Sequence, residues 1–262
     1  MNSSHEMRWA SLHVRSKDAD IQKHREDACA RVLEFFEQNT PIPVEDRVLC
    51  FLDDRDLPNL KAAFGGVANR GVHWPIRGQG LGIWPTDMWN VIAPPDNLDG
   101  ETTWPFASVV YLHGGTCQND IGLTLSLAHE LQHFMQFVNS SKLWAVNALL
   151  GSPDLPTEDL KVPWDLPVEK DSRVLSKRVA ESIFGKERVE GYISDRINAR
   201  ITDLDAKDWE FVKGIDPFAR YDAAAETRTL VHKYRSSLKQ LQLAPKWLQD
   251  PDVSTIDFDG YD

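Results

Sequence analysis

The chain has 262 residues, of which 42% are hydrophobic and 26% are charged, and its formal net charge is −11. The acidic excess argues against a protein that binds the nucleic-acid backbone, because such proteins concentrate Lys and Arg, and it argues against an anionic membrane surface as partner. No long apolar run suited to a membrane span occurs in the sequence. This length allows one large domain or two small ones.

The N-terminus and the cysteines indicate the compartment. The opening residues, MNSSHEMRWASLHVRSKDAD, have neither the apolar core nor the small-residue cleavage site of a secretory signal. Cys29, Cys50 and Cys117 are widely spaced and contain no C-x-x-C pair, so no disulfide framework is expected. Both features favour a cytoplasmic protein.

The N-terminal part, about residues 1–118, predicts strands and loops around one helix. We expect residues 1–16 to be loosely held and a helix to run from about Ala19 to Gln38, with its apolar residues on one side. Residues 53–90 are rich in Gly, Pro, Trp and Asp and predict long loops with short strands. Buried strands are predicted at Arg47–Leu52, Trp89–Ala93 and Ser108–His113.

The part from about residue 119 to residue 262 is predicted to be mainly helical. A long helix begins at Asn119 or Asp120, either of which could cap it, and irregular chain follows as far as about Pro167. We expect the acidic tail, DPDVSTIDFDGYD, to be exposed or weakly docked. Further helices are predicted at Pro167–Ile183, Arg188–Asn198 and Ala223–Leu241, with a helical turn at Asp208–Val212. Strands followed by helices predict a single α+β domain.

The pentad His129-Glu130-Leu131-Gln132-His133 lies in the long helix that begins near residue 119. Positions i and i+4 share one face of a helix, so both imidazoles can point at a single ion. The surrounding helix is apolar on most of its circumference and is therefore predicted to be buried, where two histidines and a glutamate are costly without partners. A metal ion removes that cost, and H-E-x-x-H is the arrangement of zinc metallopeptidases. The alternative is two core histidines held by hydrogen bonds, with Glu130 in a salt bridge.

A catalytic zinc usually has three protein ligands and one water, so a third ligand must lie outside the pentad. The metzincin pattern would need glycine at position 136 and histidine at position 139, where this chain has Gln136 and Asn139. The remaining common choice is a glutamate on a later helix. Glu169 is the first candidate, and the others are Glu158, Glu181, Glu190 and Glu226.

Glu169 lies near the start of its helix, and small residues on the same side would let this helix approach the pentad closely. These small residues are Ser172, Ser176 and Ala180. Asp171 or Arg173 could orient a metal ligand. The alternative role of Glu169 is a first-turn acid that interacts favourably with the helix dipole.

The chain resembles the gluzincin branch of the zincin-like metallopeptidases in HELQH and its helix, in SVVYLH and in the helix that opens at LPVEKD. The resemblance implies a zincin-like fold, with a small mixed sheet, an active-site helix and a mainly helical C-terminal half. It implies that Zn²⁺ is held by His129, His133 and Glu169, and that Glu130 is the general base in the hydrolysis of a peptide or protein. It also implies that a sheet-edge strand, here SVVYLH, pairs with the extended substrate.

Peptide hydrolysis also needs a donor for the oxyanion besides the metal. Gluzincins often use a tyrosine or a histidine, and no spacing rule chooses among His113, Tyr192, His232 and Tyr234. We favour His113, because it ends the strand that leads into the pentad helix.

Two other functions are compatible with the sequence. One is a zincin-fold metal-binding protein with a regulatory or toxin-like role and no proteolysis, and the other is a metal-dependent hydrolase of a non-peptide bond. Glu130 favours catalysis, because a structural zinc has no use for a base and would have four protein ligands. The sequence does not indicate the substrate preference, endo or exo action, or the oligomeric state.

Overall fold

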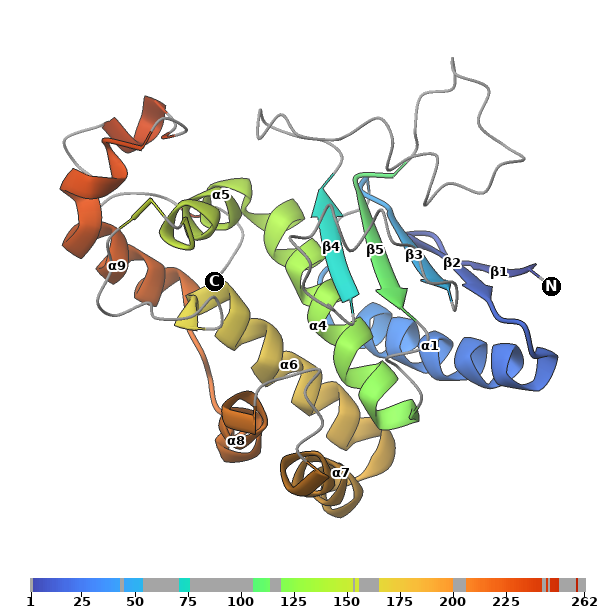
Figure 1. Ribbon diagram of the computed structural model, residues 1–262. Helices are drawn as coiled ribbons and strands as arrows, with labels where there is room; N and C mark the ends of the chain where they lie inside the picture. The colour runs from blue at the N-terminus through green and yellow to red at the C-terminus, as the bar shows by residue number, and fades with distance from the viewer. Residues whose placement is uncertain are drawn as a thin grey trace.

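The computed structural model describes residues 2–42, 45–53, 71–75, 106–113, 119–152, 154–155, 165–199, 206–241, 244, 246–249 and 258 (Figure 1). Its strands are β1 (Asn2–Glu6), β2 (Ala10–Arg15), β3 (Val48–Asp53), β4 (Gly71–Pro75) and β5 (Ser108–His113). Its helices are α1 (Ala19–Asn39), α4 (Asp120–Asn139), α5 (Ser141–Leu150), α6 (Pro167–Phe184), α7 (Lys186–Ala199), α8 (Ala206–Gly214) and α9 (Ala223–Leu238), with a 3-10 helix at Lys246–Gln249. A mixed sheet followed by a mainly helical half is therefore confirmed.

The strands form one sheet in the order β1-β2-β3-β5-β4. The three inner strands are parallel, and β1 and β4 join them in the antiparallel direction. The helix α1 connects β2 to β3, because parallel neighbours need a crossover connection. The prediction that SVVYLH forms the sheet edge is wrong: this segment is β5, which lies between β3 and β4, and β4 is the edge strand of the described part of the sheet.

Local signals in the sequence fix the ends of the helices that matter for the site. The side chain of Asn119 caps α4 by accepting a hydrogen bond from the backbone N–H of Ile121. Pro167 lies in the first turn of α6, where its missing N–H costs nothing. The helix α6 ends at Gly185, whose φ of 83° lies in the left-handed region that favours glycine.

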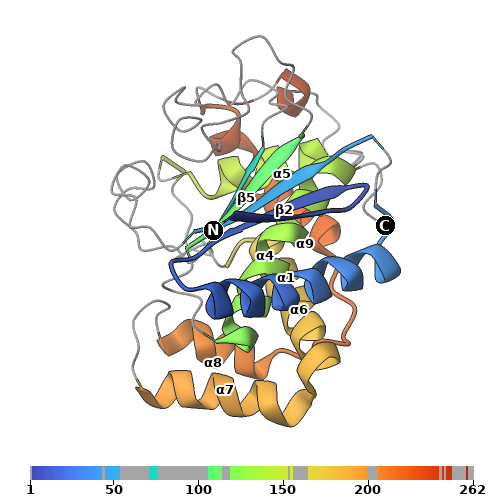
Figure 2. The ribbon, with the colours of Figure 1, turned by 90° about the vertical axis from the view of Figure 1, so that its right-hand side faces the viewer.

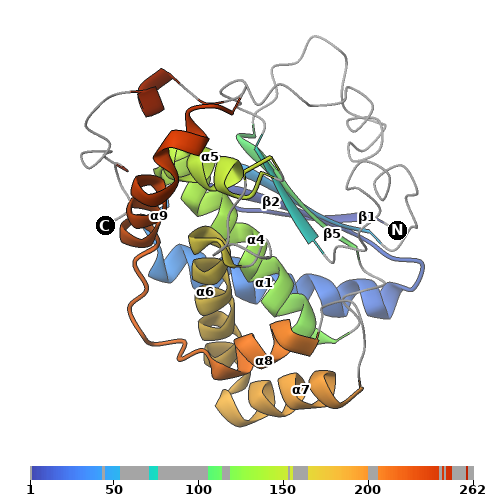
Figure 3. The ribbon, with the colours of Figure 1, turned by 60° about the vertical axis from the view of Figure 1, so that its left-hand side comes forward.

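The helices α1 and α4 cover one face of the sheet (Figure 2). The hydrophobic core between these layers includes Val32, Phe36, Val110, Leu112, Leu127, Leu131 and Phe134. Figure 3 shows α6 alongside α4. The two helices are antiparallel, since Leu125 near the start of α4 packs with Ala180 late in α6. Gln136, late in α4, meets Val168 at the start of α6.

Two smaller clusters join the remaining helices to this core. The cluster around α5 and α9 includes Phe258, which is only 3% exposed, so the predicted acidic tail is docked at this residue. The other cluster joins α4 and α6 to α7 and α8. There the buried ammonium of Lys177 binds the Glu190 carboxylate at 2.7 Å and two carbonyl oxygens at the end of α8, at 3.0 and 2.8 Å, which uses all three of its donors.

Some predictions need correction. The chain from residue 2 to residue 15 is not loosely held, since it forms β1 and β2, and Leu12 and Val14 are buried. The segment predicted to be irregular contains α5. Cys29 and Cys50 are both buried, and neither forms a disulfide among the described residues. The predicted strand Trp89–Ala93 lies outside the described residues, as do Cys117 and Glu158.

Among the described helices, none has the length and apolar character needed to cross a membrane.

Candidate metal centre

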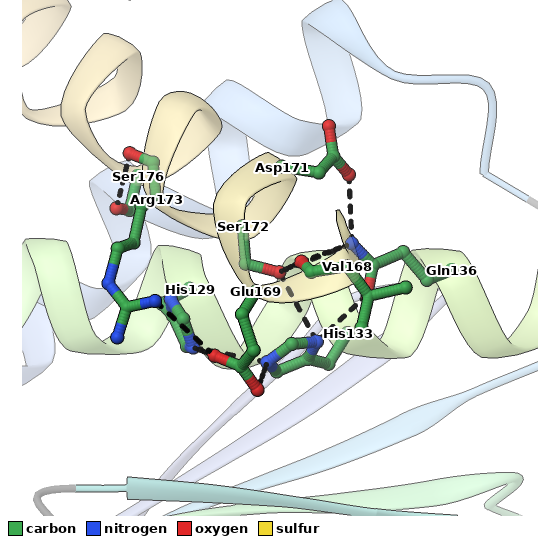
Figure 4. Close-up of polar contacts among 9 residues, drawn as sticks. All are labelled: His129, His133, Gln136, Val168, Glu169, Asp171, Ser172, Arg173 and Ser176. Atoms are coloured by element: carbon green, nitrogen blue, oxygen red, sulfur yellow. Dashed lines mark hydrogen bonds and ion pairs between the residues drawn. The ribbon is translucent and has the colours of Figure 1, made fainter. Parts of the chain in front are cut away.

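The three predicted ligands meet where α4 packs against α6 (Figure 4). The Nε2 atoms of His129 and His133 are 3.0 Å apart. One oxygen of Glu169 lies 3.2 Å from the His129 Nε2 atom, and its other oxygen lies 3.3 Å from the His133 Nε2 atom. The histidines are one turn apart on α4, and Glu169 is in the first turn of α6. In the described part of the chain, this is the single His/Cys/Asp/Glu group with a metal-binding arrangement.

The cluster is largely buried but remains reachable from solvent. The His133 side chain is 10% exposed, that of His129 18% and that of Glu169 25%. Burial of so many polar groups is costly unless they are paired with one another or with an ion. The partial exposure leaves a route for a ligand.

Partners on α6 determine which nitrogen of His133 faces Glu169. The Nε2 atom of Gln136 lies 2.8 Å from the Asp171 carboxylate and 2.9 Å from the carbonyl oxygen of Val168, two groups that accept hydrogen bonds. The amide oxygen of Gln136 must therefore face the Nδ1 atom of His133, 2.8 Å away, and can only accept a hydrogen bond from it. The Nδ1 atom consequently carries a hydrogen, and in the neutral ring the lone pair is at Nε2, facing Glu169.

Ser172 supports the same arrangement. Its hydroxyl donates to the carbonyl oxygen of Val168 at 2.9 Å, so it can only accept from the Nδ1 atom of His133, which lies 3.2 Å away. Ser172 is fully buried, as expected for a small residue where two helices approach closely. Asp171 was predicted to orient a metal ligand, and the contacts support this role indirectly: Asp171 accepts a hydrogen bond from Gln136, and Gln136 accepts one from His133.

The two histidines and the glutamate of the cluster have strongly shifted pKa values, and the two histidines shift in opposite directions. Burial lowers the pKa of His129 to about 4. Burial also acts to lower the pKa of His133, but the carboxylates of Glu169 and Glu130 raise it to about 9. Burial acts to raise the pKa of Glu169, but His133 and hydrogen bonds from both histidines hold it well below its usual range. At neutral pH a proton on His133 thus lies among the three donor atoms, in the position that a metal ion would take.

Glu130 points toward the edge strand β4. A Cβ atom at Gly71 would lie 3.0 Å from the Cγ atom of Glu130 and 2.5 Å from the side chain of Leu112, so a larger residue here would displace one of these side chains. The backbone N–H of His73 donates to the Glu130 carboxylate. Burial raises the pKa of Glu130 to about 7, against the opposing charge of His133. A carboxyl group with such a pKa can take up and release a proton at neutral pH.

The sequence did not identify His73 as a residue near the site. It is 8% exposed, its Nε2 atom lies 3.0 Å from the hydroxyl of Ser108, and its ring centroid is 6.4 Å from that of His133. His73 lies within residues 53–90, which have no periodic pattern, and the pairing of β4 with β5 brings it to α4. No local signal could have shown this.

The structure does not bring His113 to the cluster. Val110 and Leu112 of β5 face the core beside α4, and alternate residues of a strand point to opposite faces. His113 therefore shares the other face with Tyr111, whose ring stacks on Phe51. The position of His113 gives no support to its predicted role as oxyanion donor.

The other candidates for that role also lie elsewhere. Tyr192 packs on Trp209 and against Gly122 at the start of α4. His232 is exposed on α9, and Tyr234 packs in the α5–α9 cluster.

The alternative third ligands that the structure describes all pair with lysines. Glu181 and Glu190 pair with Lys177 at 3.9 and 2.7 Å. Glu226 lies 3.7 Å from Lys170. Glu169 is thus the one of these described glutamates that meets the histidines.

Two imidazole nitrogens and one carboxylate oxygen form a donor set that suits zinc. Donor atoms held about 2.0–2.1 Å from one tetrahedral ion lie about 3.3 Å from one another. The two histidine nitrogens are 3.0 Å apart, and each lies 3.2–3.3 Å from a different oxygen of the Glu169 carboxylate. One ligand atom from each of the three residues lies within 4.8 Å of the others, so a small turn of the carboxylate would let one or both oxygens bind such an ion. Comparison with protein-family models, with curated proteins and with solved structures finds no match to this chain.

Proposed function

We propose that the protein is a zinc-dependent metallopeptidase with a zincin-like fold. The observation that carries this proposal is the convergence of His129, His133 and Glu169 at separations of 3.0–3.3 Å, with Glu130 on the next position of the same helix. Three protein ligands leave one position open, which is the pattern of catalytic rather than structural zinc.

Zinc held by these residues would polarise the scissile carbonyl group and activate a water molecule. Glu130 then takes a proton from the water and passes it to the nitrogen of the leaving amine. Its raised pKa, about 7, suits both transfers at neutral pH. The hydrogen bond from the backbone of His73 holds the carboxylate toward β4.

The position of Glu130 beside an edge strand supports a peptide as the substrate. In the described part of the sheet, β4 has one strand neighbour, β5. An extended peptide can add to such an edge by main-chain hydrogen bonds. A peptide aligned along β4 would pass Gly71 and His73, which are the residues of β4 that contact Glu130.

The decisive experiment separates metal binding from catalysis. Wild type and Glu130→Gln are compared for zinc content and for cleavage of a quenched fluorescent peptide library. We expect one zinc per chain in both proteins and cleavage only by wild type, because the amide cannot accept the proton. The matched control is Glu34→Gln, on an exposed position of α1, which should cleave like wild type. Cleavage by Glu130→Gln, or a wild-type protein that binds no zinc, would overturn the proposal.

A further inference from the structure

Arg173 is a buried cation at the edge of the metal centre. The residue is 8% exposed, and its Nη1 atom is buried without a hydrogen-bond partner among the described residues. The Nη1 atom forms an ion pair with a carboxylate oxygen of Glu169 at 3.7 Å, a distance too long for a hydrogen bond. Figure 4 shows the guanidinium beside His129 and Glu169.

A role in metal binding alone does not explain this arginine. Glu169 already has two closer partners, the Nε2 atoms of His129 and His133. A permanent positive charge next to a cation site repels the cation, and arginine stays charged at every accessible pH. A positive charge that the metal does not need indicates that the site also receives an anion.

The guanidinium of Arg173 lies close to the space that such an anion would occupy, beside His129 and Glu169 (Figure 4). The Arg173 Nη1 atom is 3.7 Å from Glu169, little more than the 3.0–3.3 Å separations among the donor atoms themselves. An anionic atom next to the three donor atoms would therefore be within reach of the guanidinium.

We propose that Arg173 is the oxyanion-stabilising residue of the peptidase reaction, an inference that rests on the proposed function. As the oxygen of water bonds to the scissile carbon, its proton goes to Glu130, and the C=O π pair moves to the carbonyl oxygen. Arg173 donates a charge-assisted hydrogen bond to that oxygen. When the C–N bond breaks, the C=O bond re-forms and the nitrogen leaves with the proton from Glu130.

The alternative anion is the C-terminal carboxylate of an exopeptidase substrate. Each extended residue advances the chain by about 3.3–3.6 Å, so a carboxylate one residue beyond the scissile bond would lie that much farther from the donor atoms. Arg173 directly adjoins the ligand Glu169, which favours the oxygen of the scissile carbonyl itself. The predicted donors His113, Tyr192, His232 and Tyr234 lie elsewhere in the described structure, so Arg173 takes the role that they were expected to fill.

The test measures anion binding directly and needs no substrate. The metal site is loaded with Co²⁺, whose visible spectrum reports ligands that enter the open position. The protein is titrated with inorganic phosphate, a tetrahedral oxyanion, and separately with imidazole, a neutral ligand. The variants are Arg173→Met and Arg173→Lys. Arg178→Met is the matched control, because Arg178 lies on the same helix and binds the carbonyl oxygen of Pro217 instead.

We expect phosphate affinity to fall at least about tenfold in Arg173→Met and to return in part in Arg173→Lys, with imidazole affinity and cobalt content unchanged. In the active zinc form, kcat should fall about 100- to 1000-fold with little change in KM. Unchanged phosphate affinity in a cobalt-loaded Arg173→Met protein would overturn the inference.

Two further outcomes would also decide against the proposal. Loss of cobalt from both Arg173 variants would show that Arg173 acts only by positioning Glu169. Failure of wild type to bind cobalt would instead overturn the proposed function, and the inference with it.

Discussion

The Nδ1 atom of His133 lies 2.8 Å from the amide oxygen of Gln136, and this contact directs the other nitrogen of the ring toward Glu169. The orientation of Gln136 is set in turn by acceptors on α6. The helix α6 therefore supplies one metal ligand directly and orients a second ligand that belongs to α4. The packing of these two helices determines the geometry of the centre.

The first prediction concerns Gln136. Replacement by Met keeps the volume but removes the acceptor for the His133 Nδ1–H group, so the ring loses its fixed tautomer and orientation. We expect zinc affinity, measured by competition with a chelator, to fall about 10- to 100-fold. The control is Gln22→Met, since Gln22 is also a buried helical glutamine with a hydrogen bond to a side chain, but it lies on α1. Equal zinc affinity in Gln136→Met and wild type would contradict the orienting role.

The second prediction concerns the proton that the metal must displace. In the metal-free protein the carboxylates of Glu169 and Glu130 raise the pKa of His133 to about 9, so its Nε2 atom is protonated at neutral pH. Zinc requires this atom to be deprotonated. Zinc affinity should therefore rise about tenfold per pH unit from pH 6.5 toward pH 9 and then level off.

Calorimetry in buffers of different ionisation enthalpy tests this prediction, and it should show about one proton released per zinc at pH 7. His129 does not contribute in this range, because burial lowers its pKa to about 4. Zinc affinity that stays constant between pH 6.5 and pH 9 would show that His133 is already neutral.

The sequence predicted α4 and α6 well because their signals are local. Asn119 caps α4, the apolar period continues through the pentad, and Pro167 and Gly185 mark the two ends of α6. The i, i+4 spacing then placed both histidines on one face. The small residues Ser172, Ser176 and Ala180 on the same side of α6 as Glu169 indicated close packing against α4, and this indicated Glu169 as the third metal ligand.

Other parts of the site depend on contacts between distant residues. The amide orientation of Gln136 depends on Asp171 and Val168, which lie on another helix. Gly71 and His73 reach Glu130 only because β4 pairs with β5 at the sheet edge. No periodic pattern marks such a short strand.

Two elements were missed for different reasons. The helix α5 is apolar on most sides, so it shows little periodicity, although Ser140 caps it by accepting from the backbone N–H of Leu143. The strand β2 is short and contains polar residues, yet it lies inside the sheet. Its burial comes from its neighbours in the sheet, which its own sequence does not show.

The third prediction concerns the pH dependence of peptide cleavage. Burial raises the pKa of Glu130 to about 7, and the residue must be ionised to act as a base. The value of about 7 belongs to the metal-free protein, and the charge of bound zinc lowers the pKa of a nearby carboxyl group. We therefore expect kcat/KM to fall, as the pH decreases, between about 7 and the ordinary glutamate value of about 4.3. The measurement needs zinc content checked at each pH, because protonation of His133 also lowers metal binding. Activity of a zinc-loaded protein that declines only at or below the ordinary glutamate value of about 4.3 would contradict a raised pKa of the catalytic base.

The fourth prediction concerns the close approach of β4 to Glu130. In Gly71→Ala the added Cβ would lie 2.5 Å from the Leu112 side chain and 3.0 Å from the Glu130 side chain, so β4 or one of these side chains must shift. We expect the free energy of unfolding to fall by about 1–3 kcal/mol and kcat to fall because the base is displaced. The control is Gly191→Ala on α7, where an added Cβ meets nothing within 4 Å and should stabilise the helix by about 0.5–1 kcal/mol. Wild-type stability and wild-type cleavage in Gly71→Ala would mean that β4 does not press against the catalytic carboxylate.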